Sequence, residues 1–483
     1  MRWRYILYTE GSLIFFFGLT MLLPLGFGLY YQDASVRPLL SAMGATMTTG
    51  LLLLLIFRGA QAATIGQEEG MAIVAVGWTA VGLFGALPFY LSGDEWVFVD
   101  AVFESVSGFT TTGASILSNI ETLPAGLLLW RSLIQWLGGM GIIVLSIAIL
   151  PFLGVGGMQL YKAEVPTPVP DKLKPRIRDT AKILWQVYAL FTLVQMVLLM
   201  LGGLTFFDAL CHAFTTLPTG GFSNWNSSIA HYNSLYVEAV MIFFMVLAGI
   251  NFSLHYQMLR GRPLVFWRDG ECRFFIGIVL VLVLVVAADL YAAALYRHLG
   301  EALRFSAFQV VSIITTTGFA TADYQQWPAM SQLILLACMF LGGSAGSTAG
   351  GMKVLRVILC VKFCYKELFR LVHPRAVTTI KLGGRNVSEE VMRSVLGFLA
   401  LYIALFAFTT IVLAGLGVDF VTAIGAVAAT IGNIGPGFGA VGPVDNYAQI
   451  PYLGKWLLIW CMLLGRLEIY TLLILLVPEF WRK

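Results

Sequence analysis

Charged residues are scarce in this chain. Asp, Glu, Lys and Arg make up 12% of its 483 residues, whereas soluble domains carry roughly 25%. Hydrophobic residues make up 58%, and about ten apolar stretches approach the roughly 20 residues that span a bilayer. The composition therefore excludes an ordinary globular protein. We expect an all-α polytopic membrane protein, because the stretches are continuously apolar and lack the alternation of a membrane β-barrel.

The chain also lacks the residue clusters that enzymes and metal centres need. Its six cysteines show no paired spacing for a disulfide or zinc framework, and its five histidines are scattered. Cys360 and Cys364 lie four residues apart, a spacing that helix packing explains. We find no nucleophile–base set and no cluster of metal ligands. The sequence therefore predicts no enzyme activity, no cofactor and no nucleic-acid partner.

Lysine and arginine gather in alternate connecting segments. Most of the 30 basic residues lie at the two ends, near Arg58, or in the segments 162–182, 260–273 and 353–393. Basic loops stay cytoplasmic, so both termini are predicted to be cytoplasmic and the number of crossings to be even. Ten predicted spans satisfy this rule: 5–30, 38–58, 70–92, 127–152, 181–203, 236–259, 273–297, 331–358, 391–415 and 453–477.

Four further apolar segments are too short to cross a bilayer. They cover 97–110, 205–217, 304–315 and 419–431, so we expect re-entrant half-helices there. Each is followed by a loop rich in threonine or glycine: 107–115, 214–223, 312–321 and 430–438. The corresponding glycines are Gly113, Gly220, Gly318 and Gly435. In the second loop Gly221 also fits, but the spacing from Asp208 favours Gly220.

This recurrence predicts the architecture. We expect four pseudo-symmetric repeats, each with a span, a pore helix, a loop and a second span, arranged around one pore and preceded by two N-terminal spans. The predicted units are 1–60 for the N-terminal pair, 61–165 for repeat 1, 166–265 for repeat 2, 266–385 for repeat 3 and 386–483 for repeat 4.

Glycine and threonine suit the conduction of a dehydrated cation. A ring of backbone carbonyls can replace the water around K⁺. Glycine permits the positive φ that such an extended loop requires, and pore helices direct the partial negative charge of their C-termini towards the ion. No Asp or Glu lies in the four loops, so a carboxylate ring is excluded as the selectivity device.

On these loops the chain resembles the Trk/Ktr/HKT superfamily of potassium transporters, and within it the bacterial TrkH family. Residues 60–483 match the four repeats, and 1–58 match the additional pair of spans that distinguishes TrkH from KtrB. A glycine in the first loop, where sodium-selective plant members have serine, implies potassium conduction. The resemblance implies an ion-binding filter of Thr111, Thr112, Gly113, Pro218, Thr219, Gly220, Thr316, Thr317, Gly318, Asn433, Ile434 and Gly435.

The span after the third loop is interrupted by the glycine-rich segment Leu341–Gly351. Glycine in a helix interior costs about 1 kcal/mol relative to alanine, so the helix should break there. The resemblance implies a gate formed by Gly342, Gly343, Ser344, Gly346, Ser347, Gly350 and Gly351. Close helix packing through small residues is the alternative. A phosphate-binding loop is excluded, because Lys353 comes one position late and membrane spans flank the segment.

Arg466 lies within the last span. A membrane-embedded arginine is costly, which makes it a candidate functional residue. The resemblance places it in the pore below the filter, where it would limit leakage together with the glycine-rich segment. A structural arginine bonded to carbonyls of neighbouring broken helices is the other interpretation. The partners of Glu468, Asp289 and Glu104 do not follow from the sequence.

The function predicted from this resemblance is uptake of K⁺ across the bacterial inner membrane, with K⁺ as the transported ion. The family implies a homodimer embedded in lipid and a TrkA-type cytosolic ring of nucleotide-binding domains, which the basic segments near 161–182 and 353–393 could bind. Channel-like conduction and symport with H⁺ or Na⁺ both stay open. The alternative function is ion-coupled secondary transport of a small solute, which predicts broken helices in two corresponding halves.

Overall fold

The computed structural model describes residues 1–483 except 61–66, 94–95, 149–176, 377, 383–384 and 482–483, and the side chains of 67, 142–148, 177–179, 385 and 480. The described chain is helical apart from one small antiparallel pair, β1 (Lys381–Leu382) and β2 (Arg385–Asn386). The expectation of an all-α protein is therefore confirmed.

Six apolar helical segments are long enough to cross a bilayer among the described residues, or eight if two bent helix pairs are counted. The six lie in α1 (Trp3–Thr20) with α2 (Leu22–Tyr31), α3 (Val36–Ile56), α4 (Gln67–Tyr90), α8 (Ile177–Leu201), α13 (Gly270–Ala292) and α17 (Glu389–Gly415). A further long helix is α6 (Ala125–Ala148). Of the ten predicted spans, 127–152 runs beyond the described residues.

Three of the predicted spans are broken inside the molecule. Helices α10 (Leu235–Ala248) and α11 (Phe252–Leu259) meet at 103°, and α19 (Tyr452–Arg466) meets α20 (Ile469–Leu473) and the following turn at 117°. The third break separates α15 (Ala329–Leu341) from α16 (Val354–Val372). The sequence predicted only the third break, because the other two lack a run of glycines. Continuous spans at 236–259 and 453–477 were therefore wrong.

Four short helices lie at the predicted re-entrant positions. They are α5 (Phe98–Phe109), α9 (Phe206–Thr216), α14 (Leu299–Ile314) and α18 (Phe420–Ile431). The side chains of Thr205 and Asp419 accept hydrogen bonds from backbone N–H groups in the first turns of α9 and α18, which fixes where these helices begin. The remaining short elements are α12 (Val265–Arg268) and 3₁₀ turns at Ile120–Thr122, Ser228–Tyr232, Tyr324–Gln326, Gly439–Val441, Ile474–Leu476 and Pro478–Trp481.

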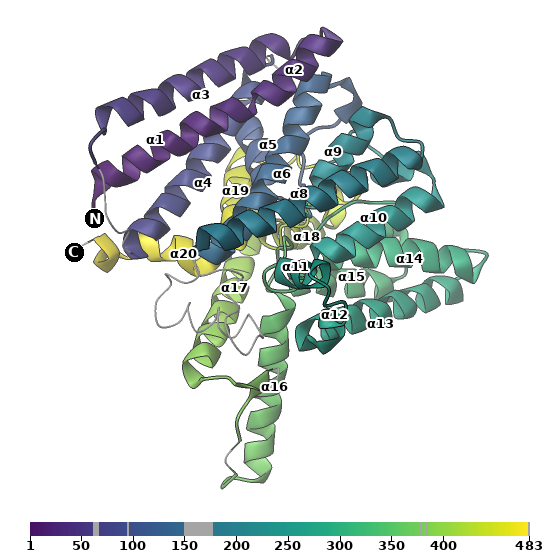
Figure 1. Cartoon of the computed structure of the whole chain (residues 1–483). Helices are drawn as coiled ribbons and strands as arrows, with labels where there is room; N and C mark the ends of the chain where they lie inside the picture. The colour runs from purple at the N-terminus through teal and green to yellow at the C-terminus, as the bar shows by residue number, and fades with distance from the viewer. Residues whose placement is uncertain (61–66, 94–95, 149–176, 377, 383–384, 482–483) are drawn as a thin grey trace.

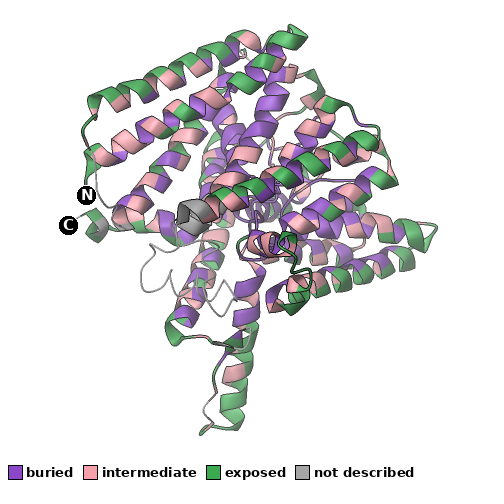
Figure 2. Cartoon of the chain, in the orientation of Figure 1, coloured by how far each residue is buried: buried purple, intermediate pink, exposed green. Residues whose placement is uncertain are grey.

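The short helices α5 and α18 lie towards the centre of the view in Figure 1, whereas α14 lies beside α13 at one edge. Figure 1 shows α1 and α3 packed side by side at one edge, while α16 extends away from the rest of the molecule. Buried residues gather in the centre, and the outer faces of the peripheral helices are exposed (Figure 2). Apolar side chains such as Phe16, Leu284 and Ile411 are more than half exposed on these faces, as lipid contact requires. The termini lie close together, with the rings of Trp3 and Trp481 stacked 5.4 Å apart.

Of the two basic segments predicted to bind a cytosolic partner, the structure describes mainly the second. Most of 161–182 lies outside the described residues. The segment 353–393 contains α16 and the β1–β2 pair, and most of its basic side chains are exposed on the extension seen in Figure 1.

Candidate functional site

Four loops with one shared backbone conformation follow the short helices. We refer to residues 110–115, 218–223, 315–320 and 432–437 as loops 1 to 4. In each loop a residue other than glycine takes a positive φ of 51–58°, and a glycine two positions later takes a φ of 74–102°. The pairs are Thr111 and Gly113, Thr219 and Gly221, Thr316 and Gly318, and Asn433 and Gly435. Positive φ is uncommon for residues with a Cβ atom, so its recurrence identifies equivalent positions.

Hydrogen bonds to the preceding helices confirm this equivalence. The residue between the two positive-φ positions donates its N–H group to a carbonyl oxygen in the last turn of the short helix. The donor–acceptor pairs are Thr112 and Ser107 (2.8 Å), Gly220 and Thr215 (2.9 Å), Thr317 and Ser312 (2.8 Å), and Ile434 and Ala429 (2.8 Å). The C-terminal ends of all four short helices therefore support the loops directly.

This geometry corrects the register predicted for loop 2. The spacing from Asp208 favoured Gly220 as the counterpart of Gly113, but Gly221 is the glycine with positive φ. Gly220 takes the place of Thr112, and Pro218 takes the place of Thr110. The sequence could not separate two adjacent glycines, because the spacing of the repeats varies by more than one residue. The backbone conformation does separate them.

The four loops contact one another in a closed order. A Cβ atom on Gly113 would overlap the carbonyl oxygen of Gly220 in loop 2, and one on Gly221 would overlap that of Thr317 in loop 3. A Cβ on Gly318 would overlap the oxygen of Ile434 in loop 4. The circuit closes at Gly435, whose Cβ would lie 2.8 Å from the oxygen of Thr112 in loop 1. The loops thus form a ring in which each glycine adjoins a backbone oxygen of the next loop.

One small cavity adjoins all four loops. It measures about 90 Å³, and its lining includes Gly113, Gly221, Gly318 and Gly435. Arg131 and Asp445 are the charged residues of this lining. Since Gly221 lines the cavity and Gly220 does not, the cavity supports the corrected register.

Side-chain hydroxyls distinguish alternate loops. In loop 1 the hydroxyls of Thr110 and Thr112 are hydrogen bonded at 2.7 Å, and in loop 3 those of Thr315 and Thr317 are bonded at 2.8 Å. The equivalent positions in the other two loops, Pro218 with Gly220 and Gly432 with Ile434, have no hydroxyl. Around the ring, the two internally braced loops therefore alternate with two that lack this brace.

The glycine-rich segment after α15 lies against loops 2 and 3. The N–H group of Gly350 donates to the hydroxyl of Thr316 at 2.7 Å. The hydroxyl of Thr348 donates at 2.8 Å to the carbonyl of Leu217, directly before loop 2. The segment also adjoins the break between α10 and α11, where Ser344 donates its N–H to Gly249. A helix break inside the molecule was predicted from these glycines, and it is present.

Arg466 ends helix α19 beside this segment. It is 3% exposed, and one of its terminal nitrogens donates to the carbonyl oxygen of Thr348 at 2.7 Å. Its Nε and Nη2 atoms have no hydrogen-bond partner among the described residues. The neighbouring Glu468 bonds instead to Arg356 of α16 at 2.7 Å. Arg466 thus brings a buried positive charge to the side of the ring where the glycine-rich segment lies.

Comparison with known proteins identifies the family. A model of the TrkH family of cation transport proteins matches residues 44–483. The chain belongs to the TrkH family. The Trk system potassium uptake protein TrkH of Salmonella typhimurium is 43% identical over the full length of both chains, and that of Escherichia coli K12 is 42% identical over both full lengths. The crystal structure of the potassium transporter TrkH from Vibrio parahaemolyticus superimposes with a TM-score of 0.92, at 39% identity and full coverage of both chains.

Membership of the TrkH family confirms the resemblance inferred from the sequence. It places the chain among membrane transporters and not among enzymes. Of the predicted filter residues, the structure brings all except Pro218 to the equivalent central positions of the four loops, and it adds Gly221. Of the predicted gate residues, Gly350 bonds to Thr316 of loop 3. Arg466 bonds to Thr348, a neighbour of the predicted gate residues that was not itself predicted.

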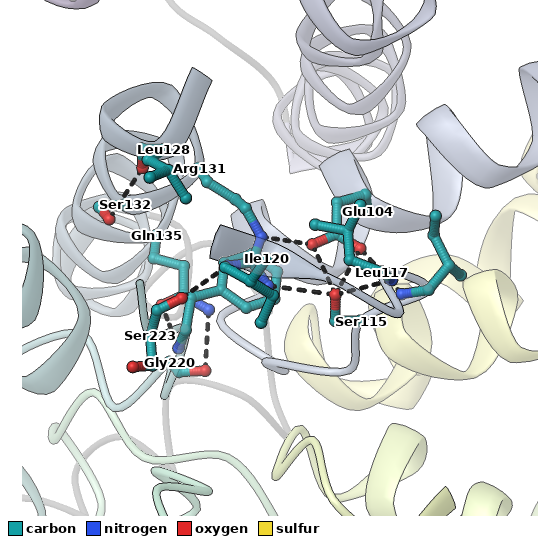
Figure 3. Close-up of polar contacts among 12 residues, drawn as sticks. Glu104, Ser115, Leu117, Ile120, Leu128, Arg131, Ser132, Gln135, Gly220 and Ser223 are labelled. Atoms are coloured by element: carbon teal, nitrogen blue, oxygen red, sulfur yellow. Dashed lines mark hydrogen bonds and ion pairs between the residues drawn. The ribbon is translucent and has the colours of Figure 1, made fainter. Parts of the chain in front are cut away.

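The sequence did not identify two buried polar residues of α6, Arg131 and Gln135, which contact loop 2 (Figure 3). They lie four residues apart, and therefore on one helix face, in an otherwise apolar span. That spacing was the available signal. Arg131 is the partner of Glu104, with Nε and Oε1 2.6 Å apart. Asp289 instead accepts a hydrogen bond from the hydroxyl of Ser331 at 2.5 Å.

Proposed function

We propose that this chain takes up K⁺ across the bacterial inner membrane through the ring of loops 1 to 4. The observation that carries the proposal is the convergence of four equivalent glycines on one cavity, each against a backbone oxygen of the next loop. Backbone oxygens arranged around an axis can replace the hydration shell of K⁺. The relatives from Salmonella typhimurium and Escherichia coli are potassium uptake proteins, which supports K⁺ as the transported ion.

The short helices supply the electrostatic part of this function. Each helix C-terminus carries a partial negative charge of about half an elementary charge. Four such termini directed at the ring stabilise a cation there without a carboxylate. The repeats with their spans and pore helices would then surround one pseudo-symmetric pore, with filter positions Thr111–Gly113, Thr219–Gly221, Thr316–Gly318 and Asn433–Gly435.

The glycine-rich segment and Arg466 would form the gate below this filter. The segment bonds to Thr316 and to the carbonyl of Leu217, so its displacement would free the path beneath loops 2 and 3. The buried charge of Arg466 would repel a cation that leaves the filter on this side. The hydrogen bond from Arg466 to Thr348 would hold the charge in place as a barrier and would also tie α19 to the glycine-rich segment.

The assembly belongs to the proposal as well. We propose a homodimer with cytoplasmic termini, regulated by a TrkA-type nucleotide-binding ring bound to the exposed basic extension around α16. Trk system relatives are named as parts of a system, which supports a further subunit. Co-purification with such a ring protein tests the proposed regulation. If the two proteins do not co-purify at the salt concentration of the cytosol, the proposed regulation is contradicted. Secondary transport of an organic solute is less well supported, because the four loops close into one ring instead of two corresponding halves.

Rubidium uptake by purified protein in liposomes tests the proposed function. Uptake should be inhibited by K⁺ and far less by Na⁺. Gly113→Ser should weaken this preference by about tenfold, because the added Cβ overlaps the carbonyl oxygen of Gly220 and displaces it. An unchanged preference in the folded variant would show that Gly113 does not form part of the ion path.

A further inference from the structure

Loop 2 lacks the hydroxyl pair that braces loops 1 and 3, and among the described residues its Thr219 hydroxyl bonds only to the carbonyl of the preceding Pro218. Loops 1 and 3 each contain a bonded pair of threonine hydroxyls, whereas loop 2 has Pro218 and Gly220 at those positions. In loop 4, which also lacks hydroxyls there, Asn433 donates to the hydroxyl of Thr112 and to a carbonyl of α19. Loop 2 also contains two consecutive glycines, whose peptide bond is restrained by no side chain of its own.

Helix α6 holds this flexible part of loop 2 from outside. The Nε2 atom of Gln135 donates to the carbonyl oxygen of Gly220 at 2.8 Å. Its Oε1 atom accepts a hydrogen bond from the N–H group of Phe222 at 3.2 Å. Gln135 is fully buried, so no water competes for these bonds. The amide thus fixes the backbone on both sides of Gly221, the glycine that lines the central cavity.

Arg131, one helical turn before Gln135, extends this support. It donates to the carbonyl oxygen of Ser223 at 2.9 Å and to the hydroxyl of Ser115 at 3.1 Å, and its guanidinium lies 3.8 Å from the centre of the Phe222 ring. Its Nε atom bonds to Glu104 of α5 at 2.6 Å. Figure 3 shows these contacts between α6, loop 1 and loop 2.

The burial of this ion pair indicates a role in positioning. Arg131 is 2% exposed and Glu104 is fully buried. Removing a charged pair from water is costly, and additional hydrogen bonds must compensate for this cost. Glu104 also accepts hydrogen bonds from the hydroxyl of Ser115 and from the N–H group of Ile116. The additional hydrogen bonds of the pair therefore all go to loops 1 and 2 or to the segment directly after loop 1. The pair therefore ties its stability to the conformation of the ring.

We infer that Gln135, supported by the Arg131–Glu104 pair, is a positioning residue that sets the ion preference of the ring through loop 2. This inference rests on the proposed function. With Gln135 present, the Gly220 oxygen is held at a fixed place beside Gly113. Without it, the peptide between Gly220 and Gly221 can rotate. The oxygen can then move closer to a smaller ion, so discrimination against Na⁺ falls more than the rate of uptake.

The test compares Gln135→Leu with Gln195→Leu in liposomes. Gln195 of α8 is also fully buried, but its Nε2 atom contacts the sulfur of Met241 and no loop of the ring. Rubidium uptake is measured with increasing K⁺ or Na⁺ as competitor. Gln135→Leu should lower the K⁺/Na⁺ preference at least about fivefold while the maximal uptake changes less, and Gln195→Leu should keep the wild-type preference.

Arg131→Lys provides a second variant, because it keeps the charge beside Glu104 but loses the forked contacts with Ser223 and Ser115. It should shift the preference in the same direction by a smaller factor. If Gln135→Leu does not fold, Arg131→Lys decides the question by the same assay. If the wild type prefers K⁺ and the variants prefer it equally, the inference is overturned but the proposed function is not. A wild type without K⁺-sensitive uptake overturns the proposed function, and the inference with it.

Discussion

Gly221→Ala should reduce rubidium uptake by more than about tenfold. The φ of Gly221 is +74°, a conformation that costs an L-residue roughly 1–2 kcal/mol. The added Cβ would also overlap the backbone oxygen of Thr317, which cannot move aside as a flexible side chain could. Either the oxygen of Thr317 or residue 221 itself must therefore move out of its position in the ring. Uptake into liposomes at matched protein density measures the loss, since tenfold corresponds to about 1.4 kcal/mol.

Gly203→Ala is the matched control for this prediction. Gly203 lies in the turn between α8 and α9 and has a φ of +92°, so alanine bears the same kind of backbone strain there. No atom lies within 4 Å of the added Cβ. Gly203→Ala should lower thermal stability slightly and leave uptake near the wild-type level. Equal losses of uptake in the two variants would attribute the effect to strain and not to the ring.

Arg466→Ala should raise the flux of K⁺ at least about fivefold. The guanidinium is buried, and within the described chain two of its three nitrogens have no hydrogen-bond partner. A poorly compensated charge close to the proposed ion path would repel a cation by several kcal/mol at an effective dielectric constant of about 20. The substitution removes this repulsion and the bond to Thr348. Initial rates of rubidium uptake without a regulatory partner measure the change.

Arg466→Lys separates charge from shape in the same assay. A lysine keeps the positive charge and should therefore keep most of the barrier. Shortening the segment Gly342–Gly351 should raise flux as Arg466→Ala does. A fall in flux after Arg466→Ala, in protein that remains folded and monodisperse, would contradict the barrier role and leave only the structural one.

Much of the architecture followed from apolar length and loop composition. The short helices α5, α9 and α18 were predicted close to their observed bounds, because about 12 apolar residues are too few for a span. Helix α14 begins at Leu299, before the predicted start at residue 304. The break after Leu341 was predicted from its glycines. The break between Gly249 and Asn251 was not predicted, since it depends on a capping bond from the N–H group of Ser253 to the side-chain oxygen of Asn251 and on contacts with the distant segment around Gly346.

The site itself was predicted less completely than the fold. Composition indicated which loops form it, but the register of loop 2 required the sign of φ at Gly221, which adjacent glycines do not reveal. Gln135 and Arg131 of α6 reach loop 2 across 85 and 92 residues of sequence. Such tertiary contacts leave only a weak local signal, here two polar residues four apart in an apolar helix.

Anomalous diffraction from crystals grown in rubidium salt tests the proposed ion path most directly. A Rb⁺ peak should lie on the axis of the ring, within coordination distance of the carbonyl oxygens of Thr112, Gly220, Thr317 and Ile434 or their neighbours in loops 1 to 4. The peak should weaken in Gly221→Ala. A strong Rb⁺ site away from these loops, with none between them in protein that takes up rubidium, would contradict the assignment of the ring as the filter.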